Sequence, residues 1–268
     1  MLLCIDIGNT NTVLATFEGD KLVHSWRTKT DARSTADELG LQLRGLLAGD
    51  AVEITGIATC STVPAALRSM RPMLARYYAD VPAVIVEPGV RTGVQLAIDN
   101  PKEVGADRVM NTLAAYTLFG GPAIVVDFGT STNFDVISAR GEFLGGVLAP
   151  GIEISVDALA ARAAQLRKIE LVKPPRIIGK NTVECLQSGV VYGFAGQVDG
   201  VVRGIISELG AVKAVIATGG LAPVVIGECA TVTHHEPWLT LIGLRLAFER
   251  NAPASRSWRR RPFGRRCQ

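Results

Sequence analysis

The chain has 268 residues, of which 48% are hydrophobic and 20% charged, the composition of an ordinary globular protein with room for two modest domains. The formal net charge of +3 is misleading, because residues Ala252–Gln268 carry six Arg and no acidic residue, and removing those six charges takes it from +3 to −3. The body therefore lacks the basic footprint of a nucleic-acid-binding protein, and no apolar run approaches the roughly 20 residues of a membrane span.

The first predicted element is a buried strand that ends in a polar loop, within Leu2–Val13 (LLCIDIGNTNTV). Asp6 closes the strand, Gly8 allows a tight turn, and short hydrogen-bonding side chains follow. Backbone N–H groups and hydroxyls of this kind can cradle phosphate oxygens, and a divalent cation would relieve the repulsion between a phosphate and Asp6. Taken alone, the stretch favours the other interpretation, a β-hairpin turn with an Asx-type cap.

The first part of the chain has the order β-β-β-α-β-α-β, typical of a ribonuclease-H-like half with a mixed sheet. After the first strand, the predicted strands are Val13–Phe17, Leu22–Arg27, Ile54–Thr59 and Ala83–Glu87. The first helix is expected to follow Ser34, which stands in capping-box spacing to Asp37. The second is expected to open at Pro64 and to be kinked or broken at Pro72.

A further helix is predicted after Pro101, with Gly105-Ala106-Asp107-Arg108 near its start. The helix dipole and the neighbouring guanidinium both favour an ionised Asp107, which could take a proton from a substrate hydroxyl. Arg108 has the fork geometry that suits a substrate carboxylate. The alternative is a surface charge pair with no catalytic role.

The stretch Ala123–Asn133 (AIVVDFGTSTN) repeats the opening motif, with Asp127 aligned on Asp6. Two such loops half a chain apart indicate a duplicated domain, which favours the phosphate cradle over the plain turn. Thr130 and Ser131 would then place hydroxyls near the phosphates. Two more strands, Phe134–Ser138 and Phe143–Leu148, complete the repeat.

The remaining predicted elements are three helices and one strand: Ile152–Leu166, Val183–Leu209, Val212–Thr218 (the strand) and Trp238–Arg250. Thr182, just before the long helix, is explained by a plain N-cap in the absence of other information. Gly219 and Gly220 follow the strand as a turn suited to the ribose or adenine side of a nucleotide, or as an ordinary loop.

The motifs DIGNTNT, GADR, DFGTSTNFD, GGVLAPGI, GKNTVE, ATGG and LTLIGLRLAFERN occur in the order found in type III pantothenate kinases, which the chain resembles from Met1 to about Asn251. That family belongs to the acetate kinase/sugar kinase/Hsp70/actin superfamily. The resemblance implies an α/β fold with two tandem ribonuclease-H-like (actin-like ATPase) domains, whose mixed sheets are flanked by helices. We expect the domains at residues 1–119 and 120–251, followed by a basic tail, 252–268, expected to be disordered.

The resemblance also implies the reaction, which is ATP-dependent phosphorylation of pantothenate, the first step of coenzyme A biosynthesis. Asp107 would be the catalytic base. The residues implied for ATP are Asp6, Ile7, Gly8, Asn9, Thr10, Asn11, Thr12, Val13 and Thr130. Those implied for pantothenate are Gly105, Ala106, Asp107, Arg108 and Thr182.

The implied cofactors are Mg²⁺ or Mn²⁺ with ATP, and a monovalent cation. Asp6 would meet Mg²⁺ through the phosphates, and Asp127 would ligate K⁺ or NH₄⁺. The family is dimeric, so a homodimer is expected. The five scattered cysteines lack CxxC spacing and no basic leader precedes the first strand, so we expect a cytoplasmic protein with reduced thiols.

Two residues depart from the pattern of the family. Ile98 stands where many relatives have a Tyr packed on pantothenate, and Asn133 replaces a Thr. Two alternatives stay open: another kinase of the superfamily acting on a sugar or acetate, against which GADR and GKNT argue, and a non-catalytic regulatory relative whose Arg-rich tail touches nucleic acid.

Overall fold

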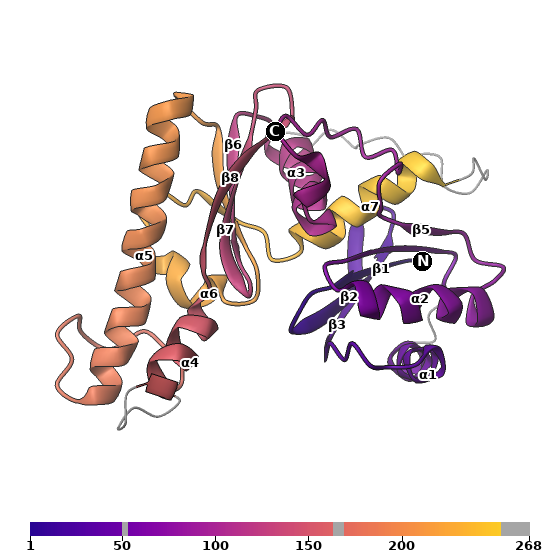
Figure 1. Ribbon diagram of the computed structural model, residues 1–268, viewed down its shortest axis with the longest axis horizontal. Coiled ribbons are helices and arrows are strands. Elements are labelled where there is room, and N and C mark those ends of the chain that lie inside the picture. The colour runs from indigo at the N-terminus through magenta and orange to yellow at the C-terminus, as the bar shows by residue number, and fades with distance from the viewer. Residues whose placement is uncertain (50–52, 163–168, 253–268) are drawn as a thin grey trace, which may run out of the picture. The chain divides into compact units, whose positions relative to one another are not determined.

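The computed structural model describes residues 1–49, 53–162 and 169–252. The chain divides into two compact units, Met1–Thr92 with Leu244–Gln268, and Gly93–Gly243 (Figure 1). The predicted basic tail lies outside the described residues from position 253 onward. Among the described residues, no helix combines the length and the apolar character needed to cross a membrane.

The first unit contains a mixed sheet with strand order β3-β2-β1-β4-β5. Its strands are β1 (Leu2–Ile7), β2 (Asn11–Glu18), β3 (Lys21–Lys29), β4 (Gly56–Ser61) and β5 (Ala83–Ile85). β1 pairs antiparallel with β2 and parallel with β4. The turn between β2 and β3 uses Gly19 at a φ of +63°, a backbone conformation that glycine adopts without strain.

Helices α1 (Ala36–Ala48) and α2 (Pro64–Tyr77) pack on one face of this sheet. The apolar alternates of β1 join them in one buried cluster: Leu3, Ile5 and Ile7. Successive strand residues point to opposite faces, so Asp6 faces the other side. On that side, helix α7 (Leu239–Asn251) brings Phe248 against Gly56, where an added Cβ would stand 2.4 Å from the ring.

The second unit repeats the arrangement with strand order β10-β9-β6-β7-β8. Its strands are β6 (Ala123–Phe128), β7 (Ser131–Ile137), β8 (Phe143–Pro150), β9 (Ala214–Thr218) and β10 (His234–His235). β6 pairs antiparallel with β7 and parallel with β9, as β1 does with β2 and β4. The predicted duplication and the predicted α/β fold with two ribonuclease-H-like domains are confirmed.

Helices cover both faces of the second sheet (Figure 1). On one face, helices α5 (Thr182–Leu209) and α6 (Ala222–Val225) pack with Ile124, Val126 and Phe128 of β6. Helix α4 (Ile152–Arg162) and the 3₁₀ turn η2 (Ile226–Glu228) contribute residues to the same hydrophobic cluster. On the other face, α3 (Ala106–Phe119), which follows the 3₁₀ turn η1 (Pro101–Glu103), packs with Val125. The predicted first domain ended at residue 119 and so included α3, whereas this helix lies in the second unit because Ala114 and Ala115 are buried against β6 and β9.

The structure differs from the sequence-based expectations at three places. The capping box of α1 is formed by Thr35 and Glu38, one residue later than predicted, because the Thr35 hydroxyl accepts the Glu38 N–H. Helix α2 is not broken and continues through Pro72 to Tyr77. The second unit also contains α6, η2 and β10, which the sequence pattern did not predict because they are only two to four residues long.

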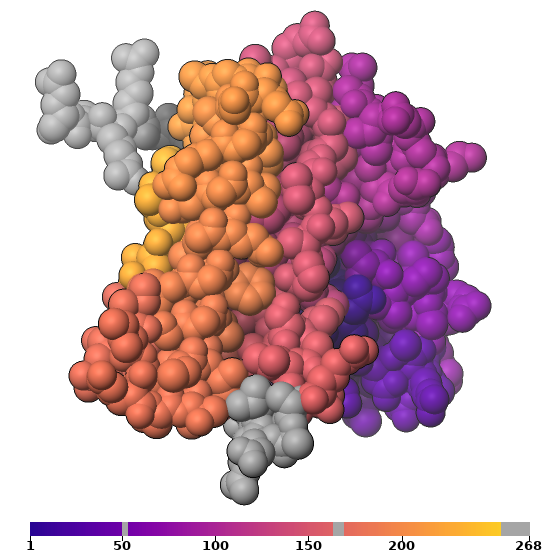
Figure 2. All heavy atoms as spheres, turned by 60° about the vertical axis from the view of Figure 1, so that its left-hand side comes forward, coloured from indigo at the N-terminus to yellow at the C-terminus, as the bar shows by residue number. Residues whose placement is uncertain are grey.

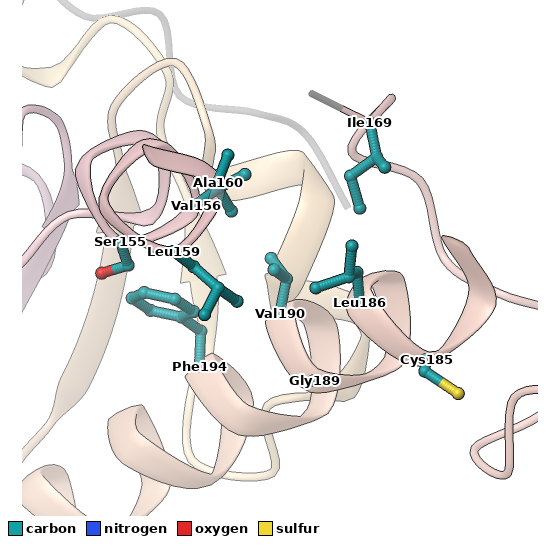
Figure 3. A pocket seen from close by; sticks show the side chains of 10 residues that line it. All are labelled: Ser155, Val156, Leu159, Ala160, Ile169, Cys185, Leu186, Gly189, Val190 and Phe194. Atoms are coloured by element: carbon teal, nitrogen blue, oxygen red, sulfur yellow. The ribbon is translucent and has the colours of Figure 1, made fainter. Parts of the chain in front are cut away.

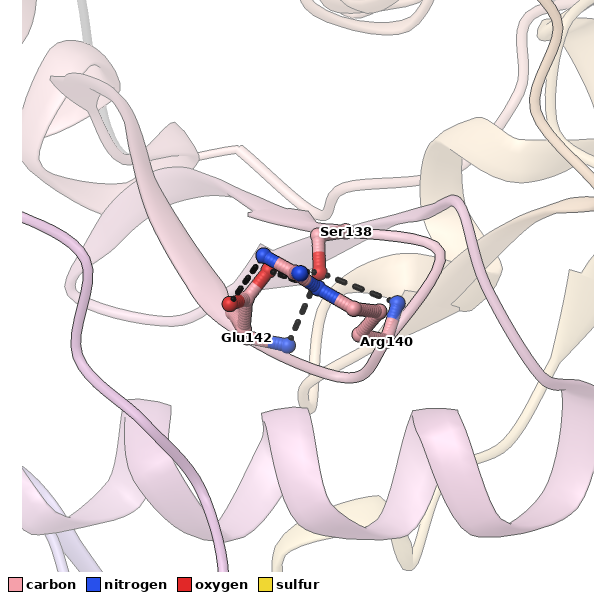
Figure 4. Close-up of polar contacts among 3 residues, drawn as sticks. All are labelled: Ser138, Arg140 and Glu142. Carbon is pink, nitrogen blue, oxygen red and sulfur yellow. Dashed lines mark hydrogen bonds and ion pairs between the residues drawn. The ribbon is translucent and has the colours of Figure 1, made fainter.

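A polar network closes the hairpin between β7 and β8 (Figure 4). The Ser138 hydroxyl donates to Glu142 at 2.7 Å and accepts the Arg140 and Glu142 backbone N–H groups at 3.1 Å. Arg140 pairs with Glu142 at 2.9 Å. The Ser138 hydrogen bond, followed by those from Arg140, lowers the pKa of the Glu142 carboxyl.

Candidate functional site

The first predicted phosphate loop is the turn between β1 and β2. Gly8 N donates to Asn11 O at 3.1 Å, and Asn9 and Thr10 are exposed at the tip. The Thr12 hydroxyl lies 2.9 Å from that of Thr30, the residue just after β3. The loop is thus a β-hairpin turn, one of the two interpretations of the sequence. Its exposed tip also presents polar groups that suit phosphate oxygens, so the turn is compatible with the predicted phosphate cradle.

The Asp6 carboxylate is held by a residue that the sequence analysis did not single out. β4 pairs with β1 so that Cys60 lies opposite Asp6. The Cys60 thiol donates to Asp6 Oδ1 at 3.4 Å. Cys60 is fully buried and one of four described free cysteines, whereas Cys267 lies outside the described residues.

The second predicted loop is the turn between β6 and β7, and Asp127 is the fifth residue of β6, as Asp6 is of β1. Thr130 is exposed at the tip of this turn. The Ser131 hydroxyl, expected near the phosphates, donates to Asn133 Oδ1 at 2.7 Å. The departure at Asn133 therefore supplies an acceptor within the strand. A Cβ on Gly151 would stand 2.2 Å from the Thr130 carbonyl oxygen, so only glycine allows β8 to end this close to the loop.

The Asn111 side chain and Gly219 border the Asp127 carboxylate. Asn111 Nδ2 donates to Asp127 Oδ2 at 3.2 Å, and the Thr240 hydroxyl donates to Asn111 Oδ1 at 2.8 Å. Gly219 lies on the other side at a φ of +91°, and a Cβ there would be 2.6 Å from Asp127 Oδ1. The predicted strand-to-glycine turn after β9 thus borders the predicted cation ligand.

Asp107 lies in the first turn of α3, after the N-cap Gly105. Its Oδ1 is buried and has no hydrogen-bond partner among the described residues. Burial raises the pKa of the Asp107 carboxyl; the hydrogen bond from the Arg108 backbone and the Arg108 charge oppose this without cancelling it. From the sequence, the helix dipole and the Arg108 charge were expected to dominate at Asp107, whereas desolvation has the larger effect on its pKa. An unpartnered carboxylate oxygen with a raised pKa suits a general base.

Arg108 is bound to a buried carboxylate that the sequence analysis missed. Its Nε and Nη2 lie 2.7 and 2.6 Å from Asp135 Oδ1, and its guanidinium stacks 5.0 Å from the Phe143 ring centroid. The Asp135 side chain is 0% exposed, and its Oδ2 has no partner among the described residues. Burial raises the pKa of Asp135 to about 6; Arg108 opposes this rise, whereas the Asp107 charge adds to it. Because one edge of the guanidinium is occupied, a substrate would meet its remaining N–H groups.

At the start of α5 the N-cap is Asn181, not Thr182, since Asn181 Oδ1 accepts the Glu184 N–H at 2.9 Å. The Glu184 carboxylate in turn accepts from Asn181 Nδ2 and Lys180 N. The prediction of a plain N-cap at Thr182 was therefore wrong. Thr182 is exposed at the first helical position, where its hydroxyl is not needed to cap the helix.

The residues that could hold a metal are single carboxylates. Within the described residues, no three His, Cys, Asp or Glu side chains gather into a metal site. Asp6 belongs to the first unit, and Asp107, Asp127 and Asp135 to the second. A cation at Asp6 or Asp127 would therefore need carbonyl, water or phosphate oxygens as further ligands, as Mg²⁺ bound with a nucleotide commonly does.

A pocket of about 400 Å³ opens between α4 and α5 (Figure 3). Its lining is mainly apolar: Ser155, Val156, Leu159, Ala160, Ile169, Cys185, Leu186, Gly189, Val190 and Phe194. None of the predicted site residues in the described part of the chain lines it. Cys185 is less than one turn from Thr182 on the same helix.

Comparison with known proteins assigns the family. The model of the type III pantothenate kinase family matches residues 2–204. The type III pantothenate kinase of Salinispora arenicola is 78% identical over 251 residues, which cover 94% of this chain and 100% of that protein. The chain belongs to the type III pantothenate kinase family. The type III pantothenate kinase of Acidothermus cellulolyticus is 69% identical, with 94% of this chain and 100% of that protein covered.

Solved structures that resemble this type III pantothenate kinase family member share its fold. The ethanolamine utilization protein EutJ from Carboxydothermus hydrogenoformans has a TM-score of 0.56 at 17% identity, covering 91% of this chain and 88% of its own. The ROK hexokinase from Thermus thermophilus has a TM-score of 0.51 at 14% identity, covering 92% and 97%. At such identities the likeness concerns the fold alone.

Three polar residues of this family member were not predicted from the sequence: Cys60 beside Asp6, Asn111 beside Asp127 and Asp135 beside Arg108. Asp135 had one usable signal, since a carboxylate at an inward position of a strand between apolar residues needs a buried partner. Asn111 gave a weaker signal, because Asn is unfavourable inside a helix. Cys60 gave none, because only the pairing of β4 with β1 brings it to Asp6.

Proposed function

We propose that this chain phosphorylates pantothenate with Asp107 as the general base. The family's reaction transfers the γ-phosphoryl group of ATP to the pantothenate hydroxyl, the first step of coenzyme A biosynthesis, and the chain carries it out. The observation that supports Asp107 is its buried Oδ1, which lacks a hydrogen-bond partner among the described residues. That oxygen accepts the hydroxyl proton while the substrate oxygen bonds to the γ-phosphorus and the bond to ADP breaks.

The proposed ATP site uses the two turns that follow β1 and β6. Asp6–Val13 would contact the phosphates through the exposed tip of the first turn, and Thr130 through the second. ATP and a divalent metal ion belong to the chemistry of a kinase family. Mg²⁺ or Mn²⁺ would neutralise phosphate charge, with Asp6 facing it through the phosphates. The Cys60 thiol keeps Asp6 oriented without adding a positive charge that would compete with the metal ion.

The proposed pantothenate site is built on Gly105–Arg108 and Thr182. Gly105 has an extended backbone (φ −60°, ψ 145°) and no side chain, so the first N–H groups of α3 are open to a substrate. Asp135 fixes the Arg108 guanidinium, so this positive charge is oriented before substrate arrives. Thr182 offers its hydroxyl, since Asn181 caps the helix. Ile98, which lies beside Gly145 of β8, gives an apolar contact in place of the Tyr of many relatives.

We also propose Asp127 as the ligand of a monovalent cation, K⁺ or NH₄⁺. The residues present fit such an ion, because a carboxylate oxygen is a suitable cation ligand and Asn111, which donates to Asp127 Oδ2, is a neutral donor that leaves the negative charge of the carboxylate in place. A cation bound there would offset phosphate charge.

A homodimer is proposed as the assembled state. Five glycines repeat along an exposed stripe of α5, and a Cβ on any of them would meet open space: Gly189, Gly193, Gly196, Gly200 and Gly204. Helix α5 lies at the surface in Figure 2. Exposed apolar side chains accompany it on β8, α4 and α5: Leu148, Ile154, Leu159 and Val183. Small residues in a stripe permit close approach of a second helix, and an apolar surface of this kind supports association.

The dimer is tested by light scattering after size exclusion. Gly196→Glu places a charge in the stripe and should give a monomer. Gly45→Glu is the matched control, since Gly45 also faces open space, on α1 in the first unit. A Gly196→Glu protein that remains dimeric would remove α5 from the interface.

The reaction is tested by ADP release with ATP, Mg²⁺ and pantothenate, in K⁺ and then in Na⁺. We expect turnover that depends on pantothenate and falls in Na⁺. Asp107→Asn should lower kcat by roughly 10²–10⁴, the scale of losing a general base. Unchanged kcat in a folded Asp107→Asn protein excludes Asp107 as the base. Absence of turnover by the wild-type protein in either salt would instead favour the regulatory alternative.

A further inference from the structure

Asn111 occupies a position where its side chain needs a specific reason. It lies inside α3, one turn after Asp107, and is 0% exposed. Asn is a poor residue for a helix interior because its amide competes with the backbone for hydrogen bonds. Here the amide group forms a specific side-chain contact, because Asn111 Nδ2 donates to Asp127 Oδ2 at 3.2 Å.

Thr240 at the start of α7 fixes the orientation of that amide. Its hydroxyl donates to Asn111 Oδ1 at 2.8 Å, which places the oxygen toward Thr240 and the NH₂ group toward Asp127. A side chain that both accepts and donates is required between a hydroxyl and a carboxylate. Leu, Val or Ala at position 111 would break both hydrogen bonds.

The backbone around Thr240 is fixed against α3. A Cβ on Gly243 would stand 2.2 Å from the Met110 carbonyl oxygen, so the N-terminal part of α7 lies directly on α3. Leu239 is 0% exposed and belongs to the cluster that includes Ala114 and Val125. Thr240 is therefore held between these two contacts, and its hydroxyl has a defined position relative to Asn111.

We propose that Asn111, oriented by Thr240, is a positioning residue that sets the direction of the Asp127 carboxylate for its cation. The inference rests on the proposed role of Asp127 as ligand of K⁺ or NH₄⁺. A neutral amide suits this task better than Lys or Arg, because it satisfies one carboxylate oxygen and leaves the negative charge available to the cation. Gly219, which approaches Oδ1, limits the carboxylate from the opposite side.

The test compares Thr240→Val, which removes the hydroxyl and keeps the shape, with Thr240→Ser, which keeps the hydroxyl. Thr117→Val is the matched control, because the Thr117 hydroxyl donates to the Leu113 carbonyl within α3 and does not face Asp127. Two quantities are measured at constant ionic strength with choline as the replacing ion. They are the K⁺ concentration for half-maximal activity, and the rise in Tm that K⁺ causes with a non-hydrolysable ATP analogue and no pantothenate.

For Thr240→Val we expect a roughly three- to tenfold higher half-activating K⁺ concentration, the scale of one lost neutral hydrogen bond. The rise in Tm should need correspondingly more K⁺, while kcat at saturating K⁺ stays within about twofold of wild type. Thr240→Ser and Thr117→Val should behave as wild type in both measurements. Asn111→Leu should show a larger increase than Thr240→Val.

Two outcomes contradict the inference and separate it from the proposed cation site. If the wild type depends on K⁺ but Thr240→Val responds to K⁺ as wild type does, the cation site stands and the positioning role is wrong. If the wild type shows no dependence on K⁺ in either measurement, the cation role of Asp127 fails, and the inference built on it fails as well.

Discussion

Replacing Asp135 with Asn tests whether burial or the ion pair controls this carboxylate. Asp135 is 0% exposed and its Oδ1 lies 2.6 Å from Arg108 Nη2, a geometry that by itself indicates a stabilising pair. Nevertheless burial raises the pKa of Asp135 from 3.8 to about 6, so desolvation destabilises the ionised carboxylate by more than the Arg108 charge stabilises it. We therefore expect Asp135→Asn to remove a pH-dependent loss of stability.

The sign and size follow from linkage. Because the pKa is higher in the folded state, the folded protein holds the proton more tightly, so stability from this group is fully present below about pH 4 and is lost as pH rises through about 6. With a folded pKa of about 6, the wild type should lose about 1.4 kcal/mol relative to Asp135→Asn between pH 5 and pH 8. Above pH 8 the difference should stay constant.

The assay is urea unfolding of both proteins at pH 5, 6, 7 and 8, at one protein concentration. Asp20→Asn, at the exposed β2–β3 turn, controls for the loss of a surface carboxylate. A difference that is independent of pH between pH 5 and pH 8 would show that the Arg108 pair at least offsets the effect of burial on this carboxyl. The variant should also bind pantothenate more weakly, since Arg108 loses its charged anchor.

Three further predictions concern single residues. Asn181→Ala should cost about 1 kcal/mol of stability by removing the N-cap of α5, measured by urea unfolding, whereas Thr182→Ala should leave stability unchanged and raise the KM for pantothenate. Cys60→Val should raise the KM for MgATP, because it removes the thiol that donates to Asp6, whereas Cys60→Ser keeps a donor and should have the KM of the wild type. A Cys60→Val protein with the same KM for MgATP as the wild type would contradict this role. Gly146→Ala would place a Cβ 1.7 Å from a backbone carbonyl oxygen of β7 and should abolish soluble expression; a stable, active variant would refute the close packing.

The family motifs and the duplicated loops could be read from the sequence because their signals are local. A buried strand, a carboxylate and a glycine turn lie within about a dozen consecutive residues, so Asp6 and Asp127 were found at equivalent positions of β1 and β6. The long helix α5 also follows from its own residues. The one-residue error in the capping box arose because Ser34 and Thr35 can both cap, and only the hydrogen bonds distinguish them.

The sequence by itself determined the fold class, the family and the position of Asp107 at a helix start, because periodicity and motif spacing are properties of neighbouring residues. Only the tertiary structure decided the surroundings of these residues. Strand pairing brings Cys60 to Asp6, and the packing of α7 on α3 brings Thr240 to Asn111 and so to Asp127. Burial likewise reversed the expected balance at Asp107, since desolvation depends on how many distant parts of the chain exclude water from a carboxylate.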